Sequence, residues 1–288
     1  MKIGWIEISK KKYGGIVYNE EARQALLNDF DVELIVKEAK YFKNFKYLKI
    51  PESVIYLTTL SGYKDLWIRD FYSVLTMPLD KTSGKNMAII HHDDFSGYPI
   101  LTRPIFKIAQ QIFYRNLKKV DAIVVVSEYW QKYFLDKGYK NVYKIYNAFD
   151  LNEFNISQAQ ADEFKKCHNL ADKPIIYLGN CQKPKGVIEA YNALKDLDVY
   201  LVTSGKKKVD IPAINLELDY RDYLRLLKAS SVVLTMSKFK EGWCRTAHEA
   251  MLCKTPVIGS GLGGMKELLE GGKQVVSQDF KNLKKEVE

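Results

Sequence analysis

The sequence lacks a long hydrophobic run. None of the apolar stretches in its 288 residues reaches the roughly 18–20 residues that a membrane-spanning helix needs. The N-terminal stretch carries Glu7 among its apolar residues and contains no small-residue cleavage site, so it does not have the pattern of a signal peptide. We therefore expect a cytoplasmic protein.

Cysteine and histidine are scarce, with four of each. The cysteines Cys167, Cys181, Cys244 and Cys253 form no C-x-x-C pair, which argues against a zinc ribbon or a redox disulfide. Disulfide frameworks are typical of small secreted domains rather than of a chain of this length. We interpret all four cysteines as free thiols.

Acidic residues are fewer than basic ones, and the formal net charge is +9. Residues 1–150 carry +6 and the remainder carries +3. An excess of this sign favours an anionic partner such as a phosphorylated substrate, a membrane surface or a nucleic acid. A lysine-rich solvated surface is the other interpretation, and the abundance of Lys, Tyr and Ile is also typical of a thermophile.

The order of apolar and amphipathic stretches indicates an α/β fold built twice. Continuous apolar runs alternate with helical stretches, as in parallel sheets that helices cover on both faces. We predict an N-terminal Rossmann-like domain over residues 1–150, a polar linker with a short helix over 151–172, and a C-terminal Rossmann-like domain over 173–288. The predicted strands are Lys2–Ile8, Asp31–Val36, Val54–Leu57, Ala88–Ile90, Ala122–Val126, Val142–Tyr146, Pro174–Leu178, Val199–Thr203, Ser231–Thr235, Pro256–Ile258 and Gln274–Ser277. The predicted helices are Glu20–Leu27, Pro104–Leu117, Tyr129–Lys137, Val187–Leu194, Tyr220–Leu227, Arg245–Leu252 and Met265–Leu269.

Loops that follow strands are the candidate site, because ligands of such sheets bind beyond the carboxyl ends of the strands. One of these loops contains Glu241, and Glu249 follows eight positions later inside a predicted helix. Eight residues are a little over two helical turns, so both carboxylates can point the same way. Such a pair suits the hydroxyls of a sugar or a ribose, and two unrelated surface glutamates are the alternative.

This segment resembles the E-x7-E region of retaining glycosyltransferases of family 4, the glycosyl transferases group 1, which have the GT-B fold. The resemblance rests on Ser237, Glu241-Gly242-Trp243-Cys244, Glu249-Ala250-Met251, Pro256-Val257-Ile258 and Gly263-Gly264. It continues in chain order through Gly14-Gly15, His91-His92-Asp93, Asp121–Glu128, Asn147-Ala148-Phe149-Asp150 and Gly179–Gly186. It implies two facing Rossmann-like domains with parallel sheets and a cleft between them.

The resemblance also implies an activity. Such an enzyme transfers a sugar from a nucleotide donor, for example a UDP- or GDP-sugar, to an acceptor hydroxyl with retention of anomeric configuration. The N-terminal half would bind a sugar, lipid or polymer acceptor, and the C-terminal half would bind the donor. We expect no cofactor and no metal, and a homo-oligomer is a further expectation.

Roles for individual residues follow from the same resemblance. Glu241 would contact the transferred sugar, Glu249 would hold the ribose, and Lys185 would stabilise the leaving diphosphate. Asn180 stands where the family has an arginine, which makes Lys183 a candidate for the missing charge. Cys244 stands where the family has a second glycine. The remaining candidates for donor binding are Gly186, Gly242, Trp243, Gly263, Gly264, Gly14 and Gly15.

The cluster His91-His92-Asp93-Asp94 follows a predicted strand. Adjacent side chains on an extended segment diverge, so these four residues rarely converge on one metal ion. The resemblance implies that a histidine here acts in catalysis, with His92 as the best match and His91 as the alternative register. A structural histidine is the other interpretation, and Gly14-Gly15 has a plain surface turn as its alternative.

Residues Gly259–Gly264 match the dinucleotide-binding pattern G-x-G-x-x-G. Too few residues follow them to complete a dinucleotide-binding domain. Two alternatives to a transferase nevertheless stay open. One is a non-catalytic sugar- or nucleic-acid-binding protein of GT-B type, and the other is an NAD-dependent oxidoreductase.

The segment Arg103–Lys119 is basic and aromatic, and Tyr41–Lys49 has a similar composition. Core packing with a basic solvent-exposed face explains such segments. Peripheral contact with an anionic membrane is the alternative.

Overall fold

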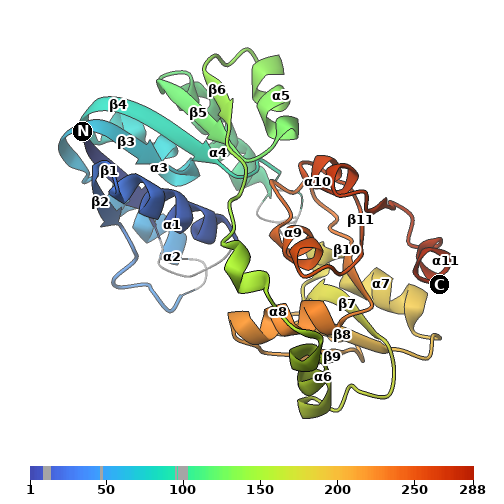
Figure 1. Ribbon diagram of the computed structural model, residues 1–288. Coiled ribbons are helices and arrows are strands. Elements are labelled where there is room, and N and C mark those ends of the chain that lie inside the picture. Colours follow the sequence, from blue (N-terminus) through green and yellow to red (C-terminus); the bar gives the residue numbers. More distant parts are fainter. Residues whose placement is uncertain (9–13, 46–47, 95, 97–102) are drawn as a thin grey trace. The chain divides into compact units, whose positions relative to one another are not determined.

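The computed structural model describes residues 1–8, 14–45, 48–94, 96 and 103–288. The chain divides into two compact units, Met1–Ala148 and Phe149–Glu288. Each unit contains one six-stranded parallel sheet with helices packed against it (Figure 1).

The sheet of the first unit has the strand order β2-β1-β3-β4-β5-β6. Its strands are β1 (Lys2–Glu7), β2 (Asp31–Val36), β3 (Ser61–Arg69), β4 (Lys81–Ile90), β5 (Ala122–Val125) and β6 (Val142–Lys144). The helices are α1 (Gly14–Leu27), α2 (Lys49–Leu57), α3 (Phe71–Thr76), η1 (Met77–Leu79), α4 (Arg103–Leu117) and α5 (Glu128–Asp136).

Side chains that alternate along the strands form the two faces of this sheet. On one face, Ala88, Ile90 and Val125 pack against Phe113 of α4 and Trp130 of α5. Toward α2, the same face continues with a second apolar cluster, made of Ile6, Leu57, Leu60 and Trp67. Figure 1 shows α1 on the opposite face. Helices α2 to α5 therefore form one layer, in the order of the strands they connect.

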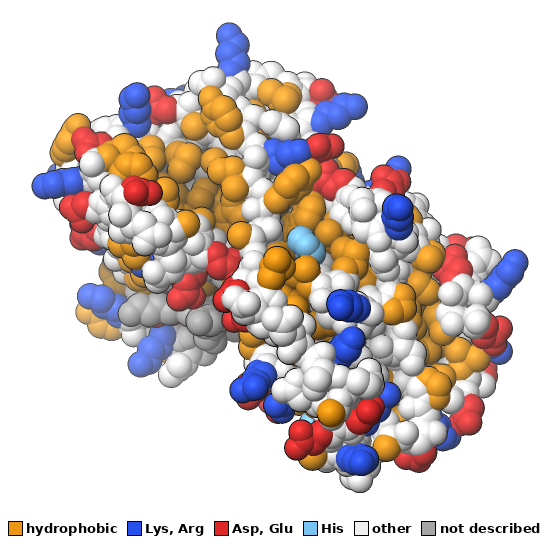
Figure 2. All heavy atoms as spheres, viewed as in Figure 1, with side chains coloured by type: hydrophobic (Ala, Val, Ile, Leu, Met, Phe, Trp, Pro, Cys, Tyr) orange, Lys and Arg blue, Asp and Glu red, His pale blue; other side chains and the backbone are white. Residues whose placement is uncertain are grey.

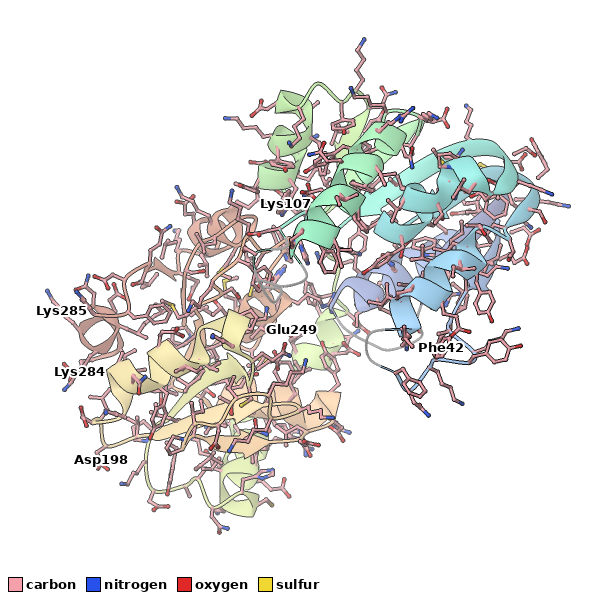
Figure 3. The ribbon with its side chains drawn as sticks, turned by 180° about the vertical axis from the view of Figure 1, so that it is seen from behind. Phe42, Lys107, Asp198, Glu249, Lys284 and Lys285 are labelled. Atoms are coloured by element: carbon pink, nitrogen blue, oxygen red, sulfur yellow. The ribbon has the colours of Figure 1, made fainter. Side chains whose placement is uncertain are left out.

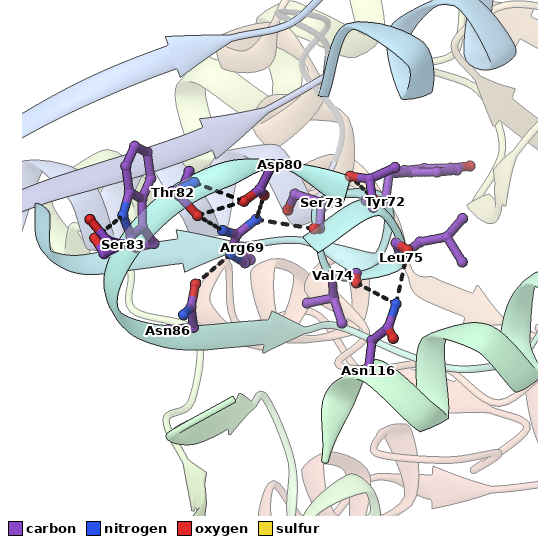
Figure 4. A network of polar contacts seen from close by, with 12 residues as sticks. Arg69, Tyr72, Ser73, Val74, Leu75, Asp80, Thr82, Ser83, Asn86 and Asn116 are labelled. Atoms are coloured by element: carbon purple, nitrogen blue, oxygen red, sulfur yellow. Dashed lines mark hydrogen bonds and ion pairs between the residues drawn. The ribbon is translucent and has the colours of Figure 1, made fainter. Parts of the chain in front are cut away.

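A buried arginine fixes the middle of the first unit (Figure 4). The guanidinium of Arg69 donates to Asp80 Oδ2 at 2.8 Å, Asn86 Oδ1 at 2.6 Å and Thr82 Oγ1 at 2.6 Å, and to the carbonyl of Ser73 at 3.1 Å. The side chains of Arg69 and Asp80 are 0% and 2% exposed. This network joins β3, α3 and β4, and it satisfies the charges that the fold removes from water.

The sheet of the second unit has the strand order β12-β11-β10-β7-β8-β9. Its strands are β7 (Ile175–Asn180), β8 (Tyr200–Ser204), β9 (Ile214–Leu216), β10 (Val232–Thr235), β11 (Val257–Gly259) and β12 (Val275–Val276). The helices are η3 (Leu151–Phe154), α6 (Gln158–Cys167), η4 (Lys183–Lys185), α7 (Val187–Leu194), α8 (Tyr220–Ala229), α9 (Arg245–Leu252), α10 (Met265–Gly271) and α11 (Leu283–Val287). One core cluster includes residues of α6, α8, α9 and α10, and the other includes residues of α7 and α11.

The structure corrects three expectations. Val54–Leu57 belongs to helix α2 rather than to a strand, because Leu57 packs among Ile6, Leu60 and Trp67. Gly14 and Gly15 begin helix α1 instead of forming a loop. The segment 151–172 is part of the second unit's core, since Phe154, Ala161, Phe164 and Leu170 are buried there.

Replacing Arg69 with Met should lower the free energy of unfolding of the first unit by about 3–5 kcal/mol, because Asp80 would stay buried without its cation. Trp5, Trp67 and Trp130 are buried in this unit, so tryptophan fluorescence during urea unfolding reports on it. The control Lys64→Ala removes an ion pair with Glu33, whose side chain is 58% exposed, and should cost less than about 1 kcal/mol. Equal losses in the two variants would contradict the role assigned to Arg69.

Candidate active site

Three strands of the second unit end beside one another at the candidate site. β7 ends at Asn180, β10 at Thr235 and β11 at Gly259, and these strands are neighbours in the sheet. Parallel strands present their carboxyl ends at one edge, where α/β sheets bind ligands. The loops after these strands carry most of the residues predicted for the donor site.

Glu241 forms the charged centre of this edge. Its carboxylate Oε1 lies 2.5 Å from Lys185 Nζ and accepts a hydrogen bond from Ser237 Oγ at 2.5 Å. Glu241 is 7% exposed, so its charge is removed from water and compensated inside the protein. Burial opposes the charge on Lys185, but the neighbouring Glu241 carboxylate outweighs it, and the pKa of Lys185 is raised. Lys185 is therefore a cation at neutral pH.

A backbone contact between two loops holds Glu241 in place. The N–H of Glu241 donates to Leu262 O at 3.1 Å, and the N–H of Gly264 donates to Glu241 O at 2.9 Å. Gly263 has φ +71°, and a Cβ atom there would lie 2.3 Å from Glu241 O. Only glycine fits this approach. The predicted donor glycines Gly263 and Gly264 thus form a support for Glu241.

Gly186 makes a similar contact for the loop after β7. It has φ +71°, and a Cβ atom there would lie 2.2 Å from Met236 O, just beyond β10. The close approach brings Lys185 beside the loop that carries Glu241. Lys183, in the same 3-10 turn, is exposed.

Glu249 lies on α9 and is 5% exposed (Figure 3). Tyr223 Oη donates to its Oε2 at 3.1 Å, Tyr220 Oη lies 3.4 Å from Oε1, and Arg245 Nε lies 3.4 Å from Oε1. Burial raises the pKa of Glu249, although these partners favour its charged form. A carboxylate offers about four acceptor positions, so capacity remains for a ligand hydroxyl.

A small pocket lies between these loops and the start of α9. Its polar lining includes Asn180, Lys185, Thr235, Ser237 and Thr246, and the thiol-bearing Cys244 completes it. Cys244 has φ −84°, a backbone conformation that a cysteine adopts without strain. Burial raises the pKa of Cys244 to about 12, and the thiol is neutral.

The remaining candidates of the second unit flank this pocket. Asn180 Oδ1 accepts a hydrogen bond from Ser204 Oγ at 3.2 Å. Trp243 Nε1 lies 3.2 Å from His248 Nδ1, which fixes the ring next to Gly242 at the start of α9. The sequence predicts neither Tyr220 nor Tyr223 as a functional residue. Their only signal is a spacing of three residues on a helix, which places them on one face.

In the first unit, His91 and Asn19 form a separate polar cluster. His91 Nε2 lies 3.1 Å from Asn19 Oδ1, and a Cβ atom on Gly15 would lie 2.9 Å from the His91 ring. Burial, with the nearby His92, lowers the pKa of His91 to about 4, so its ring is neutral at pH 7. A side chain at position 15 would therefore collide with the His91 ring, so glycine is required there for packing. Gly14 is exposed at the start of the helix.

His92 is exposed, and the residue after it anchors the segment. Asp93 is 6% exposed and accepts hydrogen bonds from Gln110 Nε2 at 2.7 Å, Tyr133 Oη at 3.2 Å and Tyr114 Oη. These partners come from α4 and α5 and hold the backbone beside His92. Which histidine acts in catalysis stays a prediction. Within the described residues, no group of three His, Cys, Asp or Glu side chains could hold a metal ion.

Comparison with known proteins supports a glycosyltransferase. Residues 158–288 match the model of the family Glycosyl transferases group 1. Spore coat protein SA of Bacillus subtilis (strain 168) is 27% identical over 176 residues, which cover 50% of this chain and 47% of that protein. The chain thus spans about half the length of this curated relative.

Solved structures with the same architecture cover nearly the whole chain. HepE of Anabaena in complex with UDP-glucose matches with a TM-score of 0.73 and 17% identity over 100% of this chain and 88% of that one. Sucrose-phosphate synthase of Thermosynechococcus elongatus matches with a TM-score of 0.78 and 15% identity over 99% and 88%. At these identities the likeness establishes the fold. The predicted α/β fold of GT-B type is confirmed.

Gly263→Ala should displace the loop that holds Glu241, because the new Cβ atom would overlap Glu241 O and the positive φ disfavours alanine. We expect a loss of about 1–3 kcal/mol in the stability of the second unit. The control Gly271→Ala lies in α10 with open space around it and should be neutral or slightly stabilising. Thermal unfolding of both variants by calorimetry is the measurement, and an unchanged Gly263→Ala protein would contradict the close approach.

Proposed function

We propose that this protein is a retaining glycosyltransferase of the family 4 type, which transfers a sugar from a nucleotide donor to an acceptor hydroxyl. The observation that carries the proposal is the buried Lys185–Glu241 pair with Ser237, at the strand ends of the part that matches the glycosyltransferase family. HepE was crystallised with UDP-glucose, which makes UDP-sugars the first donors to try.

The main electrostatic task of this site is to stabilise the negative charge of the leaving diphosphate. Negative charge grows on its bridging oxygen as the glycosidic bond breaks, and fixed positive groups stabilise that charge. Lys185 is held as a cation beside the pocket, and Ser237 and Thr246 offer hydroxyl donors. The backbone N–H groups at the start of α9 add a partial positive charge. In this proposal Lys185 exchanges Glu241 for phosphate when the donor binds.

The two glutamates divide the rest of the donor between them. Once Lys185 turns to phosphate, the Glu241 carboxylate can accept hydrogen bonds from hydroxyls of the transferred sugar. Glu249 lies on α9, eight positions after Glu241 in the sequence, and takes the ribose, with Tyr220 and Tyr223 fixing its carboxylate. Backbone groups of Gly242, Trp243 and Cys244 would hold the sugar. We propose that His92 acts from the first unit, which binds the acceptor.

No step of this proposal requires a metal or a cofactor, so transfer should continue in excess EDTA.

Retention is read directly from the anomeric coupling constant of the product by NMR. A protein that binds a nucleotide sugar but neither transfers nor slowly hydrolyses it would be the non-catalytic alternative.

Lys185→Ala should lower kcat by about 10²–10³-fold, the scale for loss of one preorganised group that stabilises transition-state charge. Donor binding should change less, because the charge on the diphosphate grows toward the transition state. The comparison variant is Lys183→Ala, two positions away and exposed, which will be nearly silent if Lys183 does not supply the charge of the family's missing arginine. A Lys185→Ala enzyme with wild-type kcat would contradict the role of Lys185. Steady-state kinetics on both single variants and the double variant measure this. If Lys183 replaces the family's arginine, its variant will instead be impaired and the two losses will not add.

Glu249→Ala should weaken binding of the matching nucleoside diphosphate by about 1.5–3 kcal/mol, the range for hydrogen bonds to a charged group. Calorimetric titration gives the affinity. The control Tyr220→Phe keeps the ring and removes a hydroxyl at 3.4 Å from the carboxylate, so it should cost far less. Unchanged affinity in Glu249→Ala would refute the ribose role.

A further inference from the structure

A second pocket of the second unit lies between helix α8 and the segment that contains η3 and α6. We call it the α8 pocket. Its volume is about 330 Å³, which is within the range of sites for small organic ligands. Figure 1 shows α6 beside α8, and both helices contribute to one core cluster. Among the described residues, this pocket and the pocket at the strand ends share no lining residue.

Two arginines of α8 line the α8 pocket. Arg221 and Arg225 are four residues apart, so their side chains lie on the same side of the helix. Only seven of the 44 basic residues in the chain are arginines. Lysine is thus its ordinary cation, whereas arginine is preferred where a planar fork of donors binds a carboxylate or a phosphate. Two like charges one turn apart also repel each other, and an anion between them would remove that repulsion.

The guanidinium of Arg225 is incompletely satisfied. Its Nη1 lies 2.8 Å from Asp222 Oδ1, in an ion pair between side chains that are 27% and 37% exposed. Its Nε is buried and has no hydrogen-bond partner among the described residues. A buried donor without a partner costs more than a partly exposed ion pair within one helical turn contributes. An anion that draws the guanidinium toward itself would therefore satisfy Nε with little loss elsewhere.

The rest of the pocket lining is mainly polar. Asn152, Asn155 and Gln160 offer amide groups, which can donate to an oxyanion or accept from hydroxyls of the same ligand. Glu153 also lines the pocket, but it is exposed, so water and salt screen its repulsion of an anion. The lining therefore suits a ligand that carries an oxyanion together with other polar groups.

Neither a membrane-spanning segment nor a broad field of charge accounts for these arginines. Basic residues often flank membrane-spanning helices. None of the helices in the described part of the chain is long and apolar enough to cross a membrane. On the face of the molecule that Figure 2 shows, Lys and Arg are interspersed with Asp and Glu. The attraction of an anion must therefore come from local donors rather than from a surface of one sign.

We propose that the α8 pocket binds an organic oxyanion, a phosphate monoester or a carboxylate, between Arg221 and Arg225. The contact with Asp222 occupies one end of the Arg225 guanidinium and leaves the edge with Nε for two parallel hydrogen bonds to the ligand. Tyr220 lines the same pocket, and its Oη lies 3.4 Å from Glu249 Oε1. The anion would therefore bind next to the candidate active site without being part of it. The proposal goes beyond the proposed function and does not rest on it.

The test is a titration of the full chain with inorganic phosphate, followed by NMR of the arginine Nε–H groups. Seven arginines give few signals, and single Arg→Lys variants assign them. The Arg225 Nε–H signal should shift and saturate, because a hydrogen bond to an oxyanion replaces its missing partner. Arg115, which is exposed on α4, is the internal control for non-specific ion effects. The same titration with acetate shows whether the pocket prefers a carboxylate to a phosphate.

Arg225→Lys keeps the positive charge but removes the fork. The affinity for phosphate, read from the Arg221 signal, should fall by about 10–100-fold, the effect of losing a hydrogen bond between charged groups. The matched control Arg115→Lys should leave the affinity unchanged. Glu153→Gln should increase it, because a carboxylate that repels the anion is removed. Unchanged Nε–H signals of Arg69 and Arg245 verify that each variant folds.

A Lys185→Ala variant separates this pocket from the proposed diphosphate site, because the shift of the Arg225 signal should persist in it. The absence of a saturable shift at Arg225 with either anion would overturn the proposal, as would full phosphate affinity in Arg225→Lys. A saturable shift with glucose but with neither phosphate nor acetate would also overturn it, and would assign the pocket to a neutral sugar.

Discussion

The buried carboxylate of Glu241 is the constraint on which the loops of the second unit depend. A charge removed from water requires a close counter-charge and hydrogen bonds, and Lys185 and Ser237 supply them. That requirement joins the loop after β7 to the loop after β10. The contact with Gly263 then adds the loop after β11. The loops after β7, β10 and β11 are thus held together by one ion pair, one hydrogen bond and one close backbone contact, all made by Glu241.

This arrangement explains why several glycines that could contact a ligand also have a structural purpose. Gly186 and Gly263 allow the backbone of one loop to touch another, and Gly15 leaves room for the His91 ring. The glycines of Gly259–Gly264 resemble a dinucleotide-binding fingerprint because both kinds of loop need a backbone segment to come very close to another group. In this protein the approach of Gly263 is to Glu241.

Elements with continuous apolar runs or a clear amphipathic pattern were predictable from the sequence. Strands β5, β7 and β10 and helices α7 and α9 lie where the pattern places them, within one or two residues. Strand β3 and helix α3 escaped prediction, because the polar network of Arg69 interrupts their apolar pattern. Val54–Leu57 is too short an apolar run for periodicity to distinguish a helix from a strand.

Within the candidate site, residue types were predictable but contacts were not. The two glutamates and Lys185 stand out by motif, whereas the partners Tyr220 and Tyr223 come from a different helix and carry no motif. The consequence of Cys244 depends on a backbone angle that the sequence does not specify. The sequence places Asp93 in a His-Asp cluster without indicating its partners, and its hydrogen bonds with Gln110 and Tyr133 make it an anchor for the segment that carries His92.

Hydrogen exchange measured with and without UDP, GDP or ADP tests the central claim, a nucleotide-sugar site at the strand ends of the second unit, most directly. Amides exchange more slowly where a bound ligand orders the backbone. One of these nucleotides should protect residues 179–186, 237–244 and 259–264 together, because Lys185, Glu241 and Gly263 form one assembly. Residues 195–199 and 253–256, at the opposite edge of the sheet, should exchange at unchanged rates. Protection at that opposite edge, or no protection by any of the three nucleotides, would contradict the account.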